Sequence, residues 1–198
     1  MKDWRPIALC NILYKIILKV LESRLKHVLS QCISNNQSVF VTGRSILDNA
    51  MVEIKVLNFM QTKTRSEDMY VALKLDISKA YDCMDWESLC AYMSKMGFHD
   101  CWIHWMSMCV ESVGYSILVN GEQVGPIIVG HRLRQGDPIS PYLFIICVEG
   151  LSTLIRDVES RGELTGTKIC RREPSVSPLL FADDYFLFSK QTRIKQML

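Results

Sequence analysis

Two adjacent aspartates, Asp183 and Asp184, stand inside the apolar run LLFADDYFLF of residues 179–188. Moving a carboxylate out of water costs free energy, and two neighbouring carboxylates raise each other's pKa. A polar turn between two strands explains the pair without any function, because Asp is common in turns. A cation site also explains it, since Mg²⁺ prefers carboxylate oxygens. Taken alone, the pair favours the turn.

A third aspartate, Asp76, follows another apolar stretch, VALKL of residues 71–75. Both acidic positions thus lie at the end of a segment with the composition of a β-strand. If the two strands lie side by side in one sheet, the three carboxylates cluster at its edge. Two Mg²⁺ ions about 3.5–4 Å apart in such a cluster activate an attacking hydroxyl and stabilise a leaving oxygen. The three positions therefore suggest nucleotidyl transfer.

Periodicity and end signals predict the helices that surround these positions. Apolar residues recur every three or four positions over residues 7–29, as in an amphipathic helix. We expect four further helices: from an N-cap at Ser45 to about residue 60, over 86–96 with Gly97 as its stop, from a cap at Asp100 to about 110, and from Ser140-Pro141 to about 159.

The remaining apolar segments predict strands. Residues 69–77 indicate a buried strand that ends at Asp76, and residues 115–129 a hairpin with a type I′ turn at Asn120-Gly121. Residues 179–188 indicate two short strands around a turn formed by the aspartate pair. Helices mixed with a mostly hairpin-built sheet predict an α+β fold rather than a parallel doubly wound one.

Bulk properties set wider limits. The chain has 198 residues, 48% of them hydrophobic, which is enough for one large domain or a compact two-lobed unit. A formal net charge of only +2 means that a nucleic-acid partner has to be argued from local features. Eight cysteines without any CxxC pair indicate reduced thiols in an intracellular protein. No apolar run reaches membrane-spanning length, so we expect no membrane partner.

Seven motifs in a fixed order carry a family resemblance. The chain resembles the reverse transcriptases of non-LTR (LINE-type) retrotransposons, most closely those of plants. The motifs are DWRPIALCNILYKIILKVLESRL (3–25), NQSVFVTGRSILDN (36–49), ALKLDISKAYDCMDW (72–86), GFH (97–99), LVNGEQVG (118–125), LRQGDPISPYLFIICVEGLS (133–152) and LLFADDYFLFSK (179–190).

This resemblance implies a right-hand polymerase with a mostly antiparallel palm sheet packed on helices. Fingers would cover about residues 1–68. The palm, with some fingers elements, would cover about 69–198, ending before the primer grip and thumb. The implied activity is RNA-directed DNA synthesis on an RNA template, from deoxynucleoside triphosphates and a DNA primer, with two Mg²⁺ ions or Mn²⁺ in their place. Family membership also implies action in the nucleus.

The resemblance assigns roles residue by residue. Asp76, Asp183 and Asp184 would be catalytic and hold the metals, assisted by the backbone carbonyl of Ile77. The other assigned residues would bind nucleotide or nucleic acid: Tyr81 as the steric gate against a 2′-hydroxyl, Gln135 and Gly136 at the incoming nucleotide, Arg5 at the triphosphate, and Arg44 on nucleic acid.

Two residues depart from the family pattern. Arg132 stands where the family usually has glycine, and a positive φ there would cost about 1 kcal/mol or more. Tyr185 replaces a small residue, and its ring would crowd a primer end beside it. Two alternatives stay open: a catalytically inactive remnant, or weak RNA-binding module, and a group II intron-type reverse transcriptase.

Overall fold

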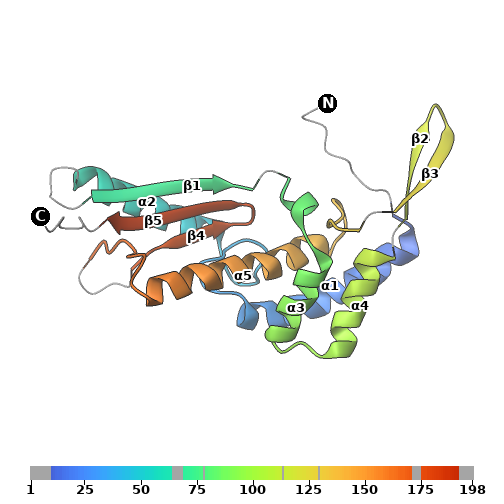
Figure 1. Ribbon diagram of the computed structural model, residues 1–198, viewed down its shortest axis with the longest axis horizontal. Helices are drawn as coiled ribbons and strands as arrows, with labels where there is room; N and C mark the ends of the chain where they lie inside the picture. The colour runs from blue at the N-terminus through green and yellow to red at the C-terminus, as the bar shows by residue number, and fades with distance from the viewer. Residues whose placement is uncertain are drawn as a thin grey trace, which may run out of the picture. The chain divides into compact units, whose positions relative to one another are not determined.

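The computed structural model describes residues 10–63, 69–77, 79–112, 114–128, 130–170 and 175–191. Its elements are shown in Figure 1. They are α1 (Ile12–Cys32), α2 (Ile46–Thr62), β1 (Met69–Asp76), the 3₁₀ helix η1 (Ala80–Cys83), α3 (Trp86–Lys95), α4 (Asp100–Glu111), β2 (Gly114–Val119), β3 (Glu122–Ile128), α5 (Ser140–Ser160), β4 (Pro178–Phe181) and β5 (Asp184–Gln191).

The chain divides into two compact units. The helical unit comprises Met1–Val28 and Lys79–Cys147, and the sheet unit comprises Leu29–Ser78 and Val148–Leu198. The residues of α1 and of α5 are therefore shared between the units. The fingers–palm boundary predicted near residue 68 falls inside the sheet unit, between α2 and β1, so it stays a prediction.

The sheet unit is built on three antiparallel strands in the order β1-β5-β4. One face of this sheet packs against α2, where Val56 meets Leu179 of β4 and Phe188 of β5 in a shared core. Because Leu179 and Phe188 are almost fully buried, the two strands next to the aspartate pair are held by apolar packing. The predicted N-cap of α2 is confirmed, since the Ser45 hydroxyl accepts the N–H of Leu47 at 3.2 Å.

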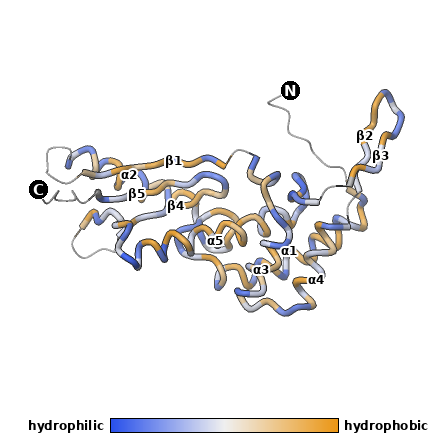
Figure 2. Tube along the Cα trace, viewed as in Figure 1, coloured by the Kyte–Doolittle hydropathy of each residue, from blue (hydrophilic) through white to orange (hydrophobic). Residues whose placement is uncertain are grey.

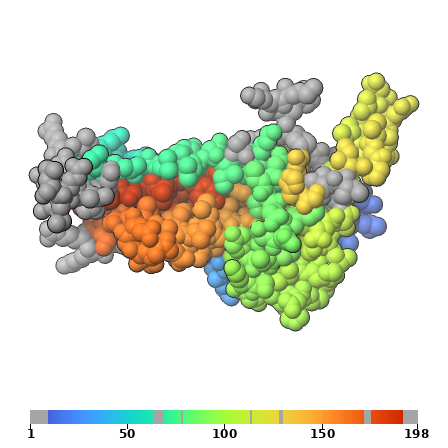
Figure 3. Space-filling view, in the orientation of Figure 1, coloured from blue at the N-terminus to red at the C-terminus, as the bar shows by residue number. Residues whose placement is uncertain are grey.

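β1 ends at Asp76 as predicted, but the prediction that this strand is buried is wrong. It lies at the edge of the sheet, and of its eight residues only Tyr70 is partly buried. Leu73 and Leu75, for example, are 45% and 44% exposed. Figure 2 shows apolar residues along the strand, and Figure 3 shows it at the molecular surface. Apolar composition identified the strand but not its position at the edge.

Local capping builds the helices of the helical unit. Gly97 ends α3 with φ +86°, and Phe98 then donates its N–H to Met93, which confirms the predicted stop. α4 is capped differently from the prediction: the His99 ring, not Asp100, accepts the N–H of Cys101 at 3.2 Å. In the hairpin of β2 and β3, Asn120 and Gly121 both have positive φ, as the predicted type I′ turn requires.

Helices combined with antiparallel strands confirm the predicted α+β fold class. All eight cysteines are free thiols. No helix in the described ranges is both long and apolar enough to cross a membrane.

Candidate active site

The strand register brings two of the three candidate aspartates face to face. β1 pairs with β5 so that Asp76 lies directly opposite Asp184. Asp183 occupies the turn just before β5, and its carbonyl accepts the backbone N–H of Ile77 at 3.2 Å. The end of β1 is thereby tied to the turn, so the backbones of the three aspartates meet at one end of the sheet, while the predicted clustering of their carboxylates stays a prediction.

The turn between β4 and β5 consists of Ala182 and Asp183, because Phe181 already pairs with Asp184. The prediction that Asp183 and Asp184 form the turn is thus wrong by one residue. Ala182 adopts φ +57°, a left-handed conformation that costs a residue with a side chain about 1 kcal/mol or more. This shift places Asp184 in the sheet, where a strand partner fixes its direction.

Lys74 lies on the same face of the sheet as Asp76 and Asp184, because side chains two residues apart on a strand share a face. Its ammonium is 3.3 Å from Asp184 Oδ1 and 5.3 Å from the centre of the Phe186 ring. A cation therefore already stands beside the carboxylates. The sequence left Lys74 unassigned, although its place two residues before Asp76 already put both on one strand face.

The three aspartates are suited to binding a divalent cation, because their carboxylates are hard oxygen ligands. The attraction of the Lys74 ammonium to Asp184 shows that positive charge is favoured there. Yet no three His, Cys, Asp or Glu side chains within the described ranges are arranged to hold a metal ion. The backbone thus brings the aspartates together, whereas a metal-holding arrangement of their side chains is not preformed.

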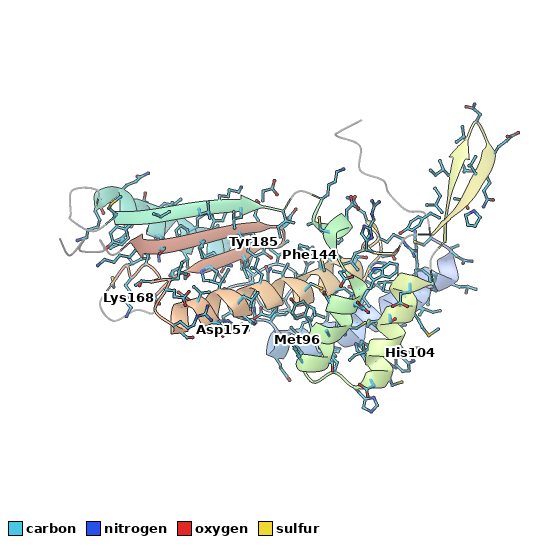
Figure 4. The ribbon with its side chains drawn as sticks, in the orientation of Figure 1. Met96, His104, Phe144, Asp157, Lys168 and Tyr185 are labelled. Carbon is cyan, nitrogen blue, oxygen red and sulfur yellow. The ribbon has the colours of Figure 1, made fainter. Side chains whose placement is uncertain are left out.

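Tyr185 points away from these carboxylates. It follows Asp184 in β5 and so occupies the opposite face of the sheet, where it is 3% exposed. Figure 4 labels it among the side chains around the sheet. The expectation that its ring crowds a primer end is therefore not met, because the ring forms part of the core.

Two of the predicted nucleotide-binding segments meet in the helical unit. Leu133, at the start of the LRQGD loop, donates its N–H to the carbonyl of Tyr81 at 2.8 Å. The Tyr81 ring stacks on Phe144 of α5, with ring centres 5.3 Å apart. Gln135 is partly buried, and Gly136 is exposed with φ +102°, where glycine avoids strain.

Arg134 anchors this loop, although sequence reasoning assigned it no role. Its side chain is only 10% exposed and forms an ion pair with Asp137, with Nε 3.4 Å from Oδ2. The guanidinium also lies over the rings of Tyr14 and Tyr115, at 4.9 and 5.7 Å. Burial raises the pKa of Tyr14, so this ring is neutral and stacks as an aromatic surface.

Arg132 has the backbone conformation that its usual glycine counterpart would favour. Its φ is +105°, so the conditional expectation of local strain applies. Its backbone is nevertheless held on both sides: the N–H donates to Met84 at 2.9 Å, and the carbonyl accepts from the Trp86 indole at 2.8 Å.

The guanidinium of Arg44, a residue predicted to bind nucleic acid, forms hydrogen bonds within the sheet unit. It donates to the backbone carbonyls of Ile33 and Gln37 at 2.8 Å each, and also to that of Ser34. The side chain thus closes the loop after α1. Binding of nucleic acid by Arg44 stays a prediction. Arg5 lies outside the described residues.

Comparison with known proteins identifies the family. The chain belongs to the reverse transcriptase (RNA-dependent DNA polymerase) family, whose model matches residues 1–197. Members of this family use divalent metal ions. The predicted membership is therefore confirmed.

Relatives among mobile elements place the chain with the non-LTR retrotransposons, also as predicted. It is 30% identical to the transposon TX1 uncharacterized 149 kDa protein of Xenopus laevis, over 96% of this chain and 14% of that protein. It is 28% identical to the Pol polyprotein of the R2DM retrotransposable element of Drosophila melanogaster, over 100% of this chain and 17% of that protein. The chain thus spans under a fifth of these two relatives.

A solved structure supports the fold. Apo telomerase from Candida tropicalis, truncated from the C-terminal domain, aligns with a TM-score of 0.53 at 13% identity, over 89% of this chain and 33% of that one. At this identity the likeness concerns the fold alone, which agrees with the predicted fingers and palm.

Proposed function

We propose that this chain is the catalytic part of a non-LTR retrotransposon reverse transcriptase. It would extend a DNA 3′ end on an RNA template from deoxynucleoside triphosphates. The observation that supports this most directly is the register of β1 and β5, which sets Asp76 opposite Asp184 with Asp183 in the adjoining turn. Family membership and the mobile-element relatives give the same class. The proposal includes action in the nucleus.

In this proposal Asp76, Asp183 and Asp184 hold two Mg²⁺ ions, with help from the Ile77 carbonyl. When bound, such ions supply charge stabilisation at the attacking and leaving oxygens. The chain's own contribution is to hold the carboxylates at one sheet end, where Lys74 offsets part of their charge. Release of Lys74 from Asp184 would accompany metal binding.

Selection and orientation of the nucleotide would fall to Tyr81, Gln135, Gly136 and Arg5. Tyr81 is braced by its stacking on Phe144 and by the backbone hydrogen bond from Leu133. A rigid ring at the sugar would exclude a 2′-hydroxyl by contact. Gln135 and Gly136 would approach the nucleotide from the loop that Arg134 anchors, and Arg5 would meet its triphosphate.

Primer extension on an RNA template with Mg²⁺ tests the proposal. We expect the unmodified chain to extend the primer, and Asp183→Asn to lose at least about a hundredfold in rate, because a metal-holding carboxylate is removed. Asp157→Asn, at an exposed position of α5, is the matched control and should keep full activity. Absence of extension by the unmodified chain, or equal extension by Asp183→Asn, would contradict the proposal.

A further inference from the structure

The outer edge of β4 is covered by the loop between α1 and α2. β4 is the edge strand on the side opposite β1, so its outward backbone groups need partners. Leu180 donates its N–H to the carbonyl of Asn36 at 3.0 Å, and Gln37 forms an isolated parallel bridge with Leu180. The loop thus adds one short backbone contact to the edge of β4, next to the turn that contains Asp183.

Asn49 of α2 also bonds to Asn36 and Leu180, the two residues that join the loop to β4. Its side-chain amide donates to the carbonyl of Asn36 at 2.8 Å and to that of Leu180 at 3.3 Å, and the residue is 8% exposed. Both the N–H and the carbonyl of Leu180 are therefore satisfied by residues from outside the sheet. One buried amide links helix, loop and strand.

Gln37 reaches the turn itself. Its side-chain Oε1 accepts the N–H of Val39 at 3.0 Å and the N–H of Ala182 at 3.4 Å. Ala182 is the left-handed residue that precedes Asp183, so this bond holds the strained position of the turn. Gln37 is only 1% exposed, and water does not compete for the contact.

The amide nitrogen of Gln37, Nε2, indicates that this side chain does more than stabilise the fold. Gln37 Nε2 is buried and has no hydrogen-bond partner among the described residues. A buried donor without an acceptor destabilises the folded state, and an apolar side chain of similar length avoids that cost. The amide of Gln37 therefore adds little net stability, because the cost of the unpaired Nε2 offsets the two hydrogen bonds that Oε1 accepts.

Arg44 holds Gln37 in place in turn. The guanidinium bonds the carbonyl of Gln37 and the carbonyls of Ile33 and Ser34, where α1 ends. A chain of contacts thus runs from the end of α1 through Arg44 and Gln37 to Ala182, next to Asp183.

We propose that Gln37 is a positioning residue for the aspartate turn, and that Asn49 and Arg44 support it from α2 and the loop. Gln37 acts through Ala182 on Asp183 and touches no substrate. The inference rests on the proposed function only for its catalytic consequence, because the brace itself is a property of the free chain.

Hydrogen–deuterium exchange of the whole chain, compared with melting temperature, tests the brace. In Gln37→Met the amides of Ala182 and Asp183 should exchange about tenfold faster, the effect of losing one buried hydrogen bond. The melting temperature should change little, because Gln37→Met removes the unpaired Nε2 donor together with the two hydrogen bonds that Oε1 accepts. Gln31→Met, the same change at an exposed position of α1, should alter neither. If Gln37→Met fails to fold, Asn49→Ala should show the faster exchange at Leu180 and Ala182.

Unchanged exchange at Ala182 would overturn the proposal, and so would acceleration of equal size in α3 and α4, which would indicate general loss of stability. A second measurement links the brace to catalysis: the Mg²⁺ concentration for half-maximal primer extension should rise in Gln37→Met, with the KM for nucleotide unchanged. Exchange needs no activity. A chain that extends no primer would thus contradict the proposed function, while the exchange rates at Ala182 and Asp183 would still support or overturn the brace.

Discussion

At the scale of single residues, the charges around Asp76 and Asp184 determine whether the two carboxylates can lie close together. Asp76 and Asp184 face each other across two strands, an arrangement in which like charges repel. Lys74, on the same face, lowers that repulsion through its contact with Asp184. The lysine side chain is 55% exposed, so the ion pair is weak and can exchange for another cation.

Removing the Lys74 ammonium should therefore increase the affinity of the aspartates for divalent cations. We expect Lys74→Met to bind Mn²⁺ or Mg²⁺ up to about fivefold more tightly, because an exposed ion pair contributes at most about 1 kcal/mol. Titration calorimetry of the free chain measures the change. Lys55→Met, at an exposed position of α2, should leave the affinity as it is. Weaker binding in Lys74→Met would show that the lysine assists the metal instead of competing with it.

Arg132 offers a test of backbone strain. Its φ of +105° is one that glycine adopts freely, so Arg132→Gly should raise the free energy of unfolding by about 1 kcal/mol. The surface ion pair with Asp82, at 3.9 Å, is too weak to offset this gain. Urea denaturation of the chain measures the difference.

The neighbouring His131→Gly is the matched control. His131 is not among the residues with positive φ, so glycine there should destabilise the chain through the entropy of the unfolded state. An equal effect of both substitutions would exclude strain at Arg132 as the cause.

At the scale of elements, the sequence predicted which segments form helices and strands better than where they lie. Gly97 and Asn120-Gly121 were predictable because glycine and asparagine tolerate the left-handed backbone that helix stops and type I′ turns require. The turn at Ala182-Asp183 was missed by one residue, because alanine gives no such signal. Its conformation depends on contacts from Gln37 and Ile77, which come from distant parts of the chain.

The exposure of β1 is a second property that local composition does not determine. An apolar strand at an edge presents unpaired backbone groups and exposed side chains, which favours association with other chains. We expect Leu73→Lys to reduce self-association of the chain, measured by light scattering against concentration, with unchanged circular dichroism. Leu154→Lys on α5, where the leucine is 59% exposed, controls for added charge. Equal effects of the two lysines would mean that net charge, and not the β1 edge, governs association.

At the scale of the whole molecule, the candidate residues are distributed over both units. Asp76, Asp183 and Asp184 belong to the sheet unit, whereas Tyr81 and the LRQGD loop belong to the helical unit. The family motifs supplied these residues, and their roles stay predictions. The spacing of the motifs carried no information on the anchoring contacts. The contacts of Arg134 with Tyr14 and of Gln37 with Ala182 join segments over a hundred residues apart. Those of Arg44 are local, but they depend on the path of the loop after α1, which no motif specifies.

The thiols provide a test of burial across both units. Burial raises the pKa of Cys147 to about 12, and only the thiolate reacts rapidly with a maleimide. At pH 8 we therefore expect the exposed thiols Cys83, Cys101 and Cys170 to be labelled first, and Cys147 at least about tenfold more slowly. Mass spectrometry of digested samples over time measures the order, and labelling in denaturant, where all thiols should react alike, is the control. Because the raised pKa of Cys147 lies well above this range, its small thiolate fraction grows tenfold with each pH unit, so a change from pH 7 to 9 should speed its labelling about a hundredfold. Native labelling of Cys147 as fast as that of Cys101 would mean that this part of α5 opens to solvent.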